Sequence, residues 1–368
     1  GISVDKEEIA IGAEGGTEKI AVSSNDQWVV RVSKPWIAVS PANGFGSAVC
    51  ELTIDSTLTN VARTAQISFT MNGREPSLVT VTQFGFGKQI LVKEPEVEIP
   101  SSDAFDNRHF KSIISTNVNF KIGSVDYSFA EEATMTEEEK REVEGERSGW
   151  VTLPKDKDLA VNLDKGARPR TLKVDFRWGM NVAPYTRVAK IHLVPVDEND
   201  QLVDNNGNKI DAVVLTVTQK AAMKIEDNRA GDSLAIITIN SKLQSMMSFD
   251  TSESMMNWSF VTLWEATDKE IKDGIVPTEA VGRVRSVSYA MIDLQDGETF
   301  PKEIRHLKYL ESFSVQSNAN RQIRTISLGE EICELEYLKD LTIFSFGINA
   351  LPENFIKLGK KLENLDLA

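Results

Sequence analysis

Alternation of apolar and polar residues dominates the first 87 positions of the chain. Apolar residues recur at every second position within several short runs, as at Trp28, Val30 and Val32, and this period is typical of strands that bury one face. Turn-forming pairs such as Asn72-Gly73 separate the runs. The pattern predicts an antiparallel β-sandwich with strands at 8–11, 17–23, 27–33, 48–55, 62–70 and 77–83.

A similar pattern returns between residues 88 and 221. The run Val79-Thr-Val-Thr-Gln83 reappears nearly unchanged as Val213-Val-Leu-Thr-Val-Thr-Gln219, and Trp150-Val-Thr-Leu-Pro154 corresponds to Trp36-Ile-Ala-Val-Ser-Pro41. The segment is therefore predicted to be a divergent second sandwich. Its acidic stretch at 131–147 contains a capping box and too few apolar residues to bury, which predicts an exposed helical insertion.

Residues 222–368 follow a longer period. A short apolar pattern, L-x-x-L-x-L in outline, begins at Leu310, Leu338 and Leu362, and a related copy begins at Val284. One such unit cannot bury its apolar side alone, so the copies are expected to stack as a solenoid. Residues 232–243, which begin with Asp232 as the expected N-cap, predict a helix that covers the first unit.

Composition and charge narrow the classes of function. The net charge of −14 argues against binding to nucleic acid or to an anionic membrane, because both need a basic surface. No apolar run approaches the ~18 residues of a membrane span. Cys50 and Cys333 fall in different segments, so we expect free thiols rather than a disulfide.

The sequence contains no catalytic or cofactor signature. His109, His192 and His306 stand far apart without a neighbouring nucleophile, which favours structural roles. The acidic run at 197–208 suggests a calcium loop, but its glycine comes two places too early, and a polar hairpin turning at Asn206-Gly207 is favoured. We therefore predict no enzyme activity, no cofactor and no bound metal.

The solvent side of the repeat strands is the candidate binding surface. Residues between the apolar positions point away from the core, and here they are mostly hydroxyls and amides with two aromatic residues. The alternation is equally compatible with ordinary solvent-exposed strand residues. The candidate residues are Trp264, Ser286, Ser288, Ser312, Ser314, Gln316, Asp340, Thr342, Phe344, Asn364 and Asp366.

Four motifs in the first segment carry a family resemblance. They are Trp28-Val-Val-Arg-Val-Ser33, Trp36-Ile-Ala-Val-Ser-Pro41-Ala-Asn-Gly44, Arg63-Thr-Ala-Gln-Ile67 and Val79-Thr-Val-Thr-Gln83. In this order they resemble the BACON family, named for Bacteroidetes-associated carbohydrate-binding often N-terminal domains. Trp28 and Trp36 are possible sugar-stacking residues, although alternation with Val30 and Val32 favours core packing for Trp28.

The third segment resembles a leucine-rich repeat array with its N-terminal cap, on its period and on Gly282-Arg-Val-Arg-Ser-Val287. The asparagine expected at the ninth position is present once, as Asn318. The resemblances together imply a mainly β chain with a C-terminal α/β solenoid. Two tandem immunoglobulin-like β-sandwiches at 1–87 and 88–221 would precede a short capped array at 222–368.

The function that these resemblances imply is recognition at the surface of a Bacteroidetes-type cell. The protein would be an exported, non-enzymatic binding or adhesion protein, attached to the outer membrane through a lipid anchor outside this sequence. Its β-sandwiches would form a stalk, and the repeat strands would bind a protein or peptide. The alternative is a carbohydrate-binding protein whose BACON-like domains bind host or dietary glycans.

Overall fold

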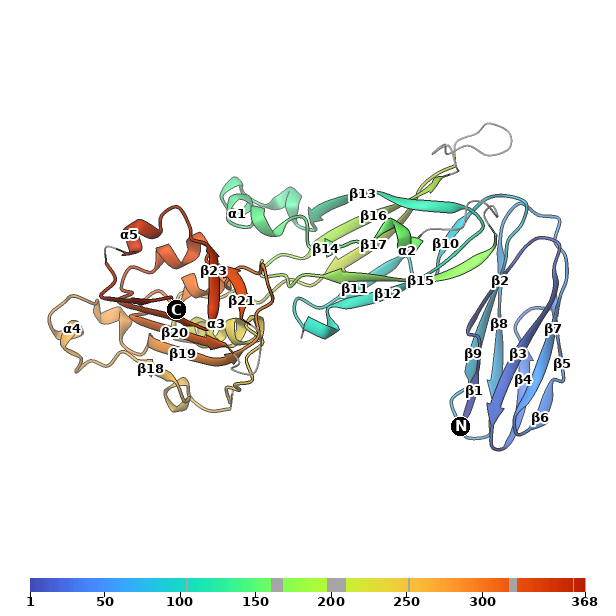
Figure 1. Ribbon diagram of the computed structural model, residues 1–368, viewed down its shortest axis with the longest axis horizontal. Helices are drawn as coiled ribbons and strands as arrows, with labels where there is room; N and C mark the ends of the chain where they lie inside the picture. Colours follow the sequence, from blue (N-terminus) through green and yellow to red (C-terminus); the bar gives the residue numbers. More distant parts are fainter. Residues whose placement is uncertain are drawn as a thin grey trace. The chain divides into compact units, whose positions relative to one another are not determined.

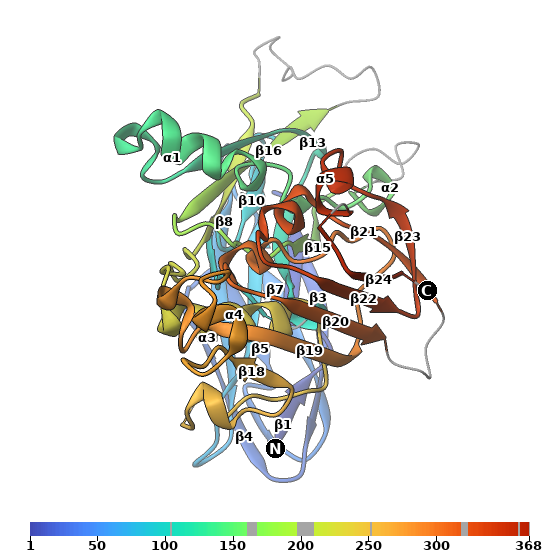
Figure 2. The ribbon, with the colours of Figure 1, turned by 90° about the vertical axis from the view of Figure 1, so that its left-hand side faces the viewer.

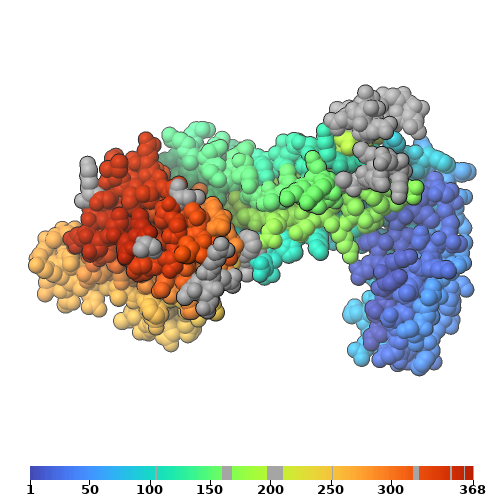
Figure 3. All heavy atoms as spheres, viewed as in Figure 1, coloured from blue at the N-terminus to red at the C-terminus, as the bar shows by residue number. Residues whose placement is uncertain are grey.

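The computed structural model describes residues 1–103, 105–159, 168–196, 210–250, 252–317, 323–359 and 361–367. The described chain is mainly β, as the sequence predicts, and it forms several separate sheets (Figure 1). It divides into two compact units. Unit 1 comprises Gly1–Ser102 and Arg108–Ala222, and unit 2 comprises Asp103–Asn107 and Met223–Ala368 (Figure 3).

The first part of unit 1 is a β-sandwich. Its sheets have the strand orders β1-β3-β7-β5 and β2-β9-β8-β4-β6, with antiparallel neighbours except for the parallel pair β2 and β9. The alternating apolar residues fill the space between the sheets. The strands are β1 (Ile2–Val4), β2 (Glu8–Ile11), β3 (Gly16–Ser24), β4 (Gln27–Val32), β5 (Ile37–Ser40), β6 (Asn43–Phe45), β7 (Ala48–Ile54), β8 (Arg63–Thr70) and β9 (Ser77–Gln83).

The two tryptophans of this sandwich have different environments. Trp28 is 1% exposed, and its indole N–H donates to the carbonyl of Gly46 over 2.7 Å. A Cβ at Gly44 would lie 2.5 Å from the Trp28 ring, so only glycine fits there. The prediction that Trp28 belongs to the core is confirmed. Trp36 is only partly buried at the edge of the same core.

The second part of unit 1 repeats the strand order of the first. Its sheets are β10-β12-β15-β14 and β11-β17-β16-β13, and β11 again runs parallel to β17. When the strands are compared in chain order, every strand of the first sandwich except β6 has a counterpart at the same place in the second. The strands are β10 (Ile90–Val92), β11 (Glu96–Ile99), β12 (His109–Thr116), β13 (Asn119–Phe129), β14 (Val151–Thr152), β15 (Arg170–Trp178), β16 (Arg187–Val196) and β17 (Val213–Gln219).

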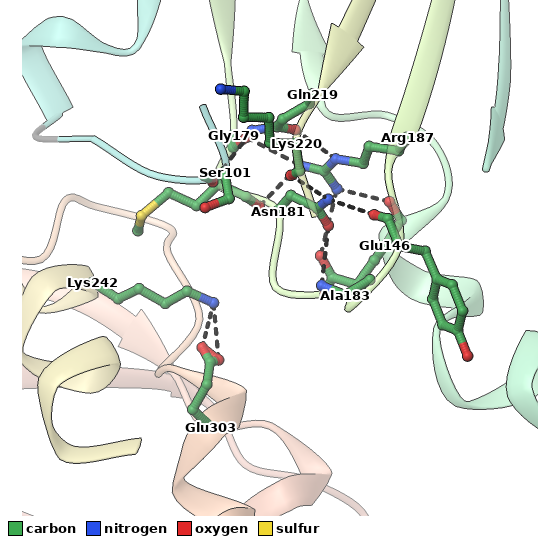
Figure 4. A network of polar contacts seen from close by, with 12 residues as sticks. Ser101, Glu146, Gly179, Asn181, Ala183, Arg187, Gln219, Lys220, Lys242 and Glu303 are labelled. Atoms are coloured by element: carbon green, nitrogen blue, oxygen red, sulfur yellow. Dashed lines mark hydrogen bonds and ion pairs between the residues drawn. The ribbon is translucent and has the colours of Figure 1, made fainter. Parts of the chain in front are cut away.

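A tryptophan, an arginine and a glutamine make the same contacts in both sandwiches. In the first, Arg63 donates to the Gln83 side-chain oxygen over 2.8 Å, and its guanidinium lies 4.3 Å from the centre of the Trp36 ring. In the second, Arg187 donates to Gln219 over 2.6 Å (Figure 4). Its guanidinium lies 4.6 Å from the centre of the Trp150 ring. Each glutamine is fully buried.

The acidic stretch at 131–147 is more firmly attached than the sequence suggests. The predicted capping box opens α1 (Glu137–Glu142), with the Thr136 side chain accepting from the Glu139 N–H. However, Met135 and Val143 are buried in a small cluster with Phe129 and Ala183. The expectation that this stretch can bury nothing is therefore wrong, because two well-spaced apolar residues are enough to attach it.

The hairpin turn predicted at Asn206-Gly207 falls in the segment between β16 and β17. Residues 197–209 lie outside the described residues. The flanking strands pair antiparallel, with Leu193 opposite Val213.

Unit 2 is built around a sheet of order β18-β19-β20-β22-β24. β19 to β24 run parallel, whereas the edge strand β18 is antiparallel to β19. Each connection between successive parallel strands contains a short helical turn, and the connections from β20 to β22 and from β22 to β24 also contain β21 and β23, which pair as a second small sheet. The elements are β18 (Val261–Leu263), β19 (Val284–Ile292), η7 (Lys302–His306), β20 (Ser312–Ser317), β21 (Arg324–Ser327), η8 (Glu330–Glu334), β22 (Asp340–Phe344), β23 (Phe346–Ala350), α5 (Phe355–Gly359) and β24 (Asn364–Asp366).

The corner after the parallel strands differs from the expected asparagine. Met291 and Ser345 adopt positive φ angles of 54° and 64°, and the next residues, Ile292 and Phe346, are buried. A residue in the left-handed conformation therefore turns the chain, and an apolar side chain occupies the ninth position, where asparagine was expected. Asn318 lies outside the described residues.

The predicted cap helix is α3 (Arg229–Lys242), which packs on this core through Ala235, Ile236 and Ile239. Its N-cap is Asn228, whose side chain accepts from Gly231 N–H over 2.8 Å. The prediction of Asp232 as N-cap is wrong. Asp232 is 1% exposed and forms a two-fold hydrogen bond with Arg283, both contacts at 2.9 Å.

We predict that Arg187→Met lowers the free energy of unfolding of unit 1 by about 3–5 kcal/mol, because it leaves buried acceptors without a donor. The matched variant Arg63→Met should cost only about 1 kcal/mol, since Arg63 is partly exposed and water can replace it. Calorimetric unfolding of the whole chain measures both. An equal loss of free energy of unfolding in the two variants would show that burial does not determine how much each arginine contributes to stability.

Candidate functional site

The candidate binding surface is the side of the parallel sheet opposite the main core of unit 2. Figure 2 shows its strands side by side in the order β18, β19, β20, β22 and β24. Strand pairing aligns polar residues into two rows that cross the sheet, the first over all five strands and the second over β19, β20, β22 and β24. The first row is Thr262, Ser286, Ser312, Asp340 and Asn364, and the second is Ser288, Ser314, Thr342 and Asp366.

We call these two rows, together with Gln316 and Phe344, the polar strand face. The structure brings ten of the eleven predicted site residues together on it, and all ten are at least partly exposed. Whether they bind a ligand stays a prediction.

Neighbouring side chains within the rows bond to one another. The hydroxyls of Ser288 and Ser314 are 2.7 Å apart, and Asn364 donates to the Asp340 carboxylate over 2.5 Å. Thr262 and Ser286 also share a hydrogen bond. These contacts fix the side chains at the strand spacing of ~4.8 Å. The face is therefore an ordered array of donors and acceptors.

Trp264 is the exception, and its prediction as an exposed aromatic is wrong. It is 1% exposed and packs with Ile271, Val276 and Ala280 in a second small cluster. Its indole N–H donates to the Tyr309 carbonyl over 2.9 Å. It lies outside the main core, as alternation predicts, but α4 (Lys269–Lys272) and η6 (Thr278–Ala280) contribute the residues that cover it.

Two other aromatic residues are exposed, Phe344 on the polar strand face and Phe260 directly before its edge strand β18. Phe344 is 40% exposed and pairs with Gln316 across the sheet. Phe260 is 63% exposed, and its carbonyl accepts from the Ser288 N–H over 3.0 Å. The sequence analysis missed Phe260, although it stands two positions before Thr262. Its φ of 66° is rare for a bulky residue and is a strained conformation.

An ion-pair network fixes the start of the first parallel strand. Besides its bonds to Asp232, Arg283 donates to Asp227 over 2.9 Å. The Arg283 hydrogen bond is the main cause that lowers the pKa of Asp227, whereas burial raises the pKa of Asp232. The Val284 N–H also donates to Asp232 over 2.9 Å. α3 and β19 are thus held in register by one carboxylate.

The first sandwich carries a second accessible surface, on the outer side of the sheet that contains β4. We call it the outer sandwich face. Strand pairing sets Gln27 opposite Phe45 and Val29 opposite Asn43. Phe45 is 71% exposed and Val29 is 50% exposed. The sequence analysis did not select Phe45, because a single aromatic in a three-residue strand gives no periodic signal.

The histidines lie apart, and none of them stands beside a nucleophile among the described residues. His109 contacts Asp175 and His192 contacts Asp126, each at 2.9 Å. Burial lowers the pKa of His306 to about 4, with a further contribution from Arg305. The described part of the chain brings together no group of three or more potential metal ligands. Within the same residues, no helix is long and apolar enough to cross a membrane.

A cavity of about 670 Å³ lies between η7, η8 and α5. Its lining is charged and includes Arg305, Glu331, Glu334 and Lys357, together with Cys333. Burial is the main cause that raises the pKa of the Cys333 thiol, so this thiol is a poor nucleophile at neutral pH. The arrangement does not support covalent chemistry.

The burial of His306 makes the stability of unit 2 depend on pH. Its pKa is about 4 in the folded state, below the usual value of 6.5. The stabilising contribution is therefore complete above pH 6.5 and is lost as the pH falls towards 4. We predict a loss of about 3 kcal/mol at most over this range. Chemical unfolding at several pH values should show a flatter profile for His306→Gln than for the control His109→Gln.

The different burial of Trp264 and Phe344 predicts different mutant stabilities. Trp264→Ala should lower the free energy of unfolding of unit 2 by about 3–5 kcal/mol, because it leaves a cavity and unpairs the Tyr309 carbonyl. Phe344→Ala and Phe260→Ala should change it by less than about 1 kcal/mol. Thermal melting of the three variants measures this. A large loss of free energy of unfolding in Phe344→Ala would indicate that the Phe344 ring is part of the core and contradict its assignment as exposed.

Residues 26–84 match the BACON family model, described as "Putative binding domain, N-terminal". The match spans β4 to β9 and includes Trp28, Trp36, Arg63 and Gln83. The resemblance predicted for the first segment is confirmed for these residues, and the chain contains a segment that matches a binding-domain family. The second copy and the leucine-rich repeats stay predictions.

Solved structures with detectable similarity have low scores. A Bacteroides ovatus GH5 xyloglucanase in complex with a XXXG heptasaccharide is 17% identical, with a TM-score of 0.23, over 28% of this chain and 22% of the xyloglucanase. The Pseudomonas aeruginosa CupB2 chaperone is 8% identical, with a TM-score of 0.22, over 60% of this chain and 100% of the chaperone. These scores support no conclusion about fold or function. No curated protein matches the chain.

Proposed function

We propose that this protein is a non-enzymatic binding protein of the cell surface, which holds a protein or peptide ligand on the polar strand face. The observation that supports it is the pair of in-register rows, which present hydroxyl, amide and carboxylate groups across five strands. A surface of this kind offers many hydrogen bonds to the main chain or side chains of a partner. The parallel sheet and its cap helix support the interpretation of 222–368 as a short leucine-rich repeat array.

Phe260 and Phe344 would supply most of the binding energy. Phe344 lies in β22 and Phe260 directly precedes β18, both rings are exposed, and aromatic contacts that become buried dominate the energetics of protein interfaces. The rows themselves contain two carboxylates, Asp340 and Asp366, and no lysine or arginine. The ligand is therefore expected to be neutral or basic where it meets the face.

The two β-sandwiches would act as a stalk in this proposal. Their common strand order and common Trp–Arg–Gln contacts support a divergent BACON-like copy at 88–221. We also propose, as the BACON resemblance implies, that the protein is exported to the cell envelope, where a lipid anchor outside this sequence would attach it to the outer membrane. We propose no nucleic-acid partner, cofactor or catalytic reaction.

A second candidate function is glycan binding by the first sandwich. The BACON match covers the outer sandwich face, and the Phe45 ring is largely exposed beside Gln27 and Asn43. An accessible ring with amide groups around it is a suitable surface for a sugar, because the ring covers the apolar side while the amides bond to hydroxyls.

One experiment separates these two functions. The whole chain is screened against a displayed peptide library and a glycan array, and each ligand is then titrated against Phe344→Ala, Phe260→Ala and Phe45→Ala. We predict a peptide ligand whose affinity falls about thirtyfold in Phe344→Ala and Phe260→Ala and is unchanged in Phe45→Ala. A glycan lost only in Phe45→Ala would support the second function instead. A ligand unaffected by all three variants would contradict both assignments.

A further inference from the structure

A cavity of about 460 Å³ opens beside the cap helix of unit 2, between α3 and residues 253–258. α3 contributes one side of its surface, with Arg229, Ser233 and Ile237 spaced at four-residue intervals. The opposite wall is formed by Glu253, Ser254, Met255 and Trp258. The volume falls in the range of small-molecule sites, roughly 300–1,000 Å³.

The floor of this cavity is apolar and continuous with the main core. Met255 is 4% exposed and Trp258 is 7% exposed, and Ile237 packs on the same cluster. The Trp258 indole N–H already donates to the Asp250 carbonyl over 2.8 Å. The ring therefore offers apolar surface to an occupant and not a donor, so an apolar side chain is the group that fits there.

The rim of the cavity carries one charge of each sign on opposite walls. Arg229 lies on α3 and Glu253 on the facing segment, where the Glu253 carboxylate accepts from the Asn257 side-chain amide over 3.2 Å. The Arg229 Nη2 donates to the Ser254 hydroxyl over 3.2 Å, a contact that links α3 to the facing segment.

We propose that this cavity binds a free apolar α-amino acid, such as leucine. The carboxylate would pair with Arg229, the ammonium group with Glu253, and the side chain would cover Ile237, Met255 and Trp258. Opposite charges above an apolar floor match such a zwitterion in both charge and polarity. The site is separate from the polar strand face, so the inference does not depend on the proposed function.

Three related ligands test the two charged contacts one at a time. L-leucine carries both charges, L-leucinamide lacks the carboxylate, and N-acetyl-L-leucine lacks the ammonium group. Titration of the whole chain is followed by calorimetry and by the NMR signal of the Trp258 indole N–H. We expect saturable binding of leucine, and binding at least about tenfold weaker for each of the other two ligands.

Two variants then assign each contact to its residue. Arg229→Met should weaken the binding of leucine about tenfold but leave the affinity for leucinamide unchanged, because leucinamide has no carboxylate to pair with Arg229. Glu253→Gln should weaken leucine and leave N-acetyl-leucine unchanged. Lys272→Met, on the exposed end of α4, is the matched control and should change none of the three.

Three results would overturn this inference. The first is the absence of saturable leucine binding up to about 10 mM, a concentration above the millimolar range of weak binding. The second is equal affinity for the three ligands. The third is an equal loss of affinity for all three ligands in both variants. Circular dichroism of the variants confirms that each is folded before its binding is compared.

Discussion

Each β-sandwich depends on one buried carboxamide at the end of its last strand. The amide nitrogen of Gln83 donates to the carbonyls of Gly12 and Asp55, over 3.1 and 2.7 Å, and so ties both sheets together. In the second sandwich Gln219 does the same with Pro100, Ser101 and Gly179. A buried carboxamide must satisfy both its donor and its acceptor. The arginine satisfies the carboxamide oxygen in each sandwich, and only in the second, where Arg187 is itself buried, can water not replace it. This pairing also explains why the closing motif ends in glutamine in both copies.

In the second sandwich the arginine that bonds the buried carboxamide also contacts residues outside the sandwich core. Arg187 also donates to the carbonyl of Glu146 over 2.7 Å and so anchors the end of the acidic insertion, while Tyr185 donates to Glu139 at its helix. Burial lowers the pKa of Arg187 to about 10, yet it stays charged at neutral pH. One residue thus closes the sheets and fastens an insertion that contributes only two apolar side chains to packing.

Most of the β structure could be predicted from the sequence, because period-two alternation reports directly which side of a strand is buried. The repeat spacing likewise predicted that Ser286, Ser312 and Asp340 fall in one row, since parallel strands one period apart must align. Alternation gives the direction of a side chain but not which other residues cover it. The prediction that Trp264 is exposed was wrong for this reason. Phe260 was missed because its positive φ interrupts the regular strand. Asp232 has an ordinary N-cap pattern, and only its buried partner Arg283 reveals its role.

Specificity and affinity have different physical sources on the polar strand face. The hydroxyls of Ser288 and Ser314 already bond to each other, so an arriving ligand needs to order few side chains and the entropic cost of binding is reduced. These polar groups also lose hydrogen bonds to water on binding, so their net contribution is small, about 1 kcal/mol each. Burial of the exposed rings of Phe260 and Phe344 carries no such loss. The rows can therefore select the partner and its register, while the two rings provide most of the binding energy.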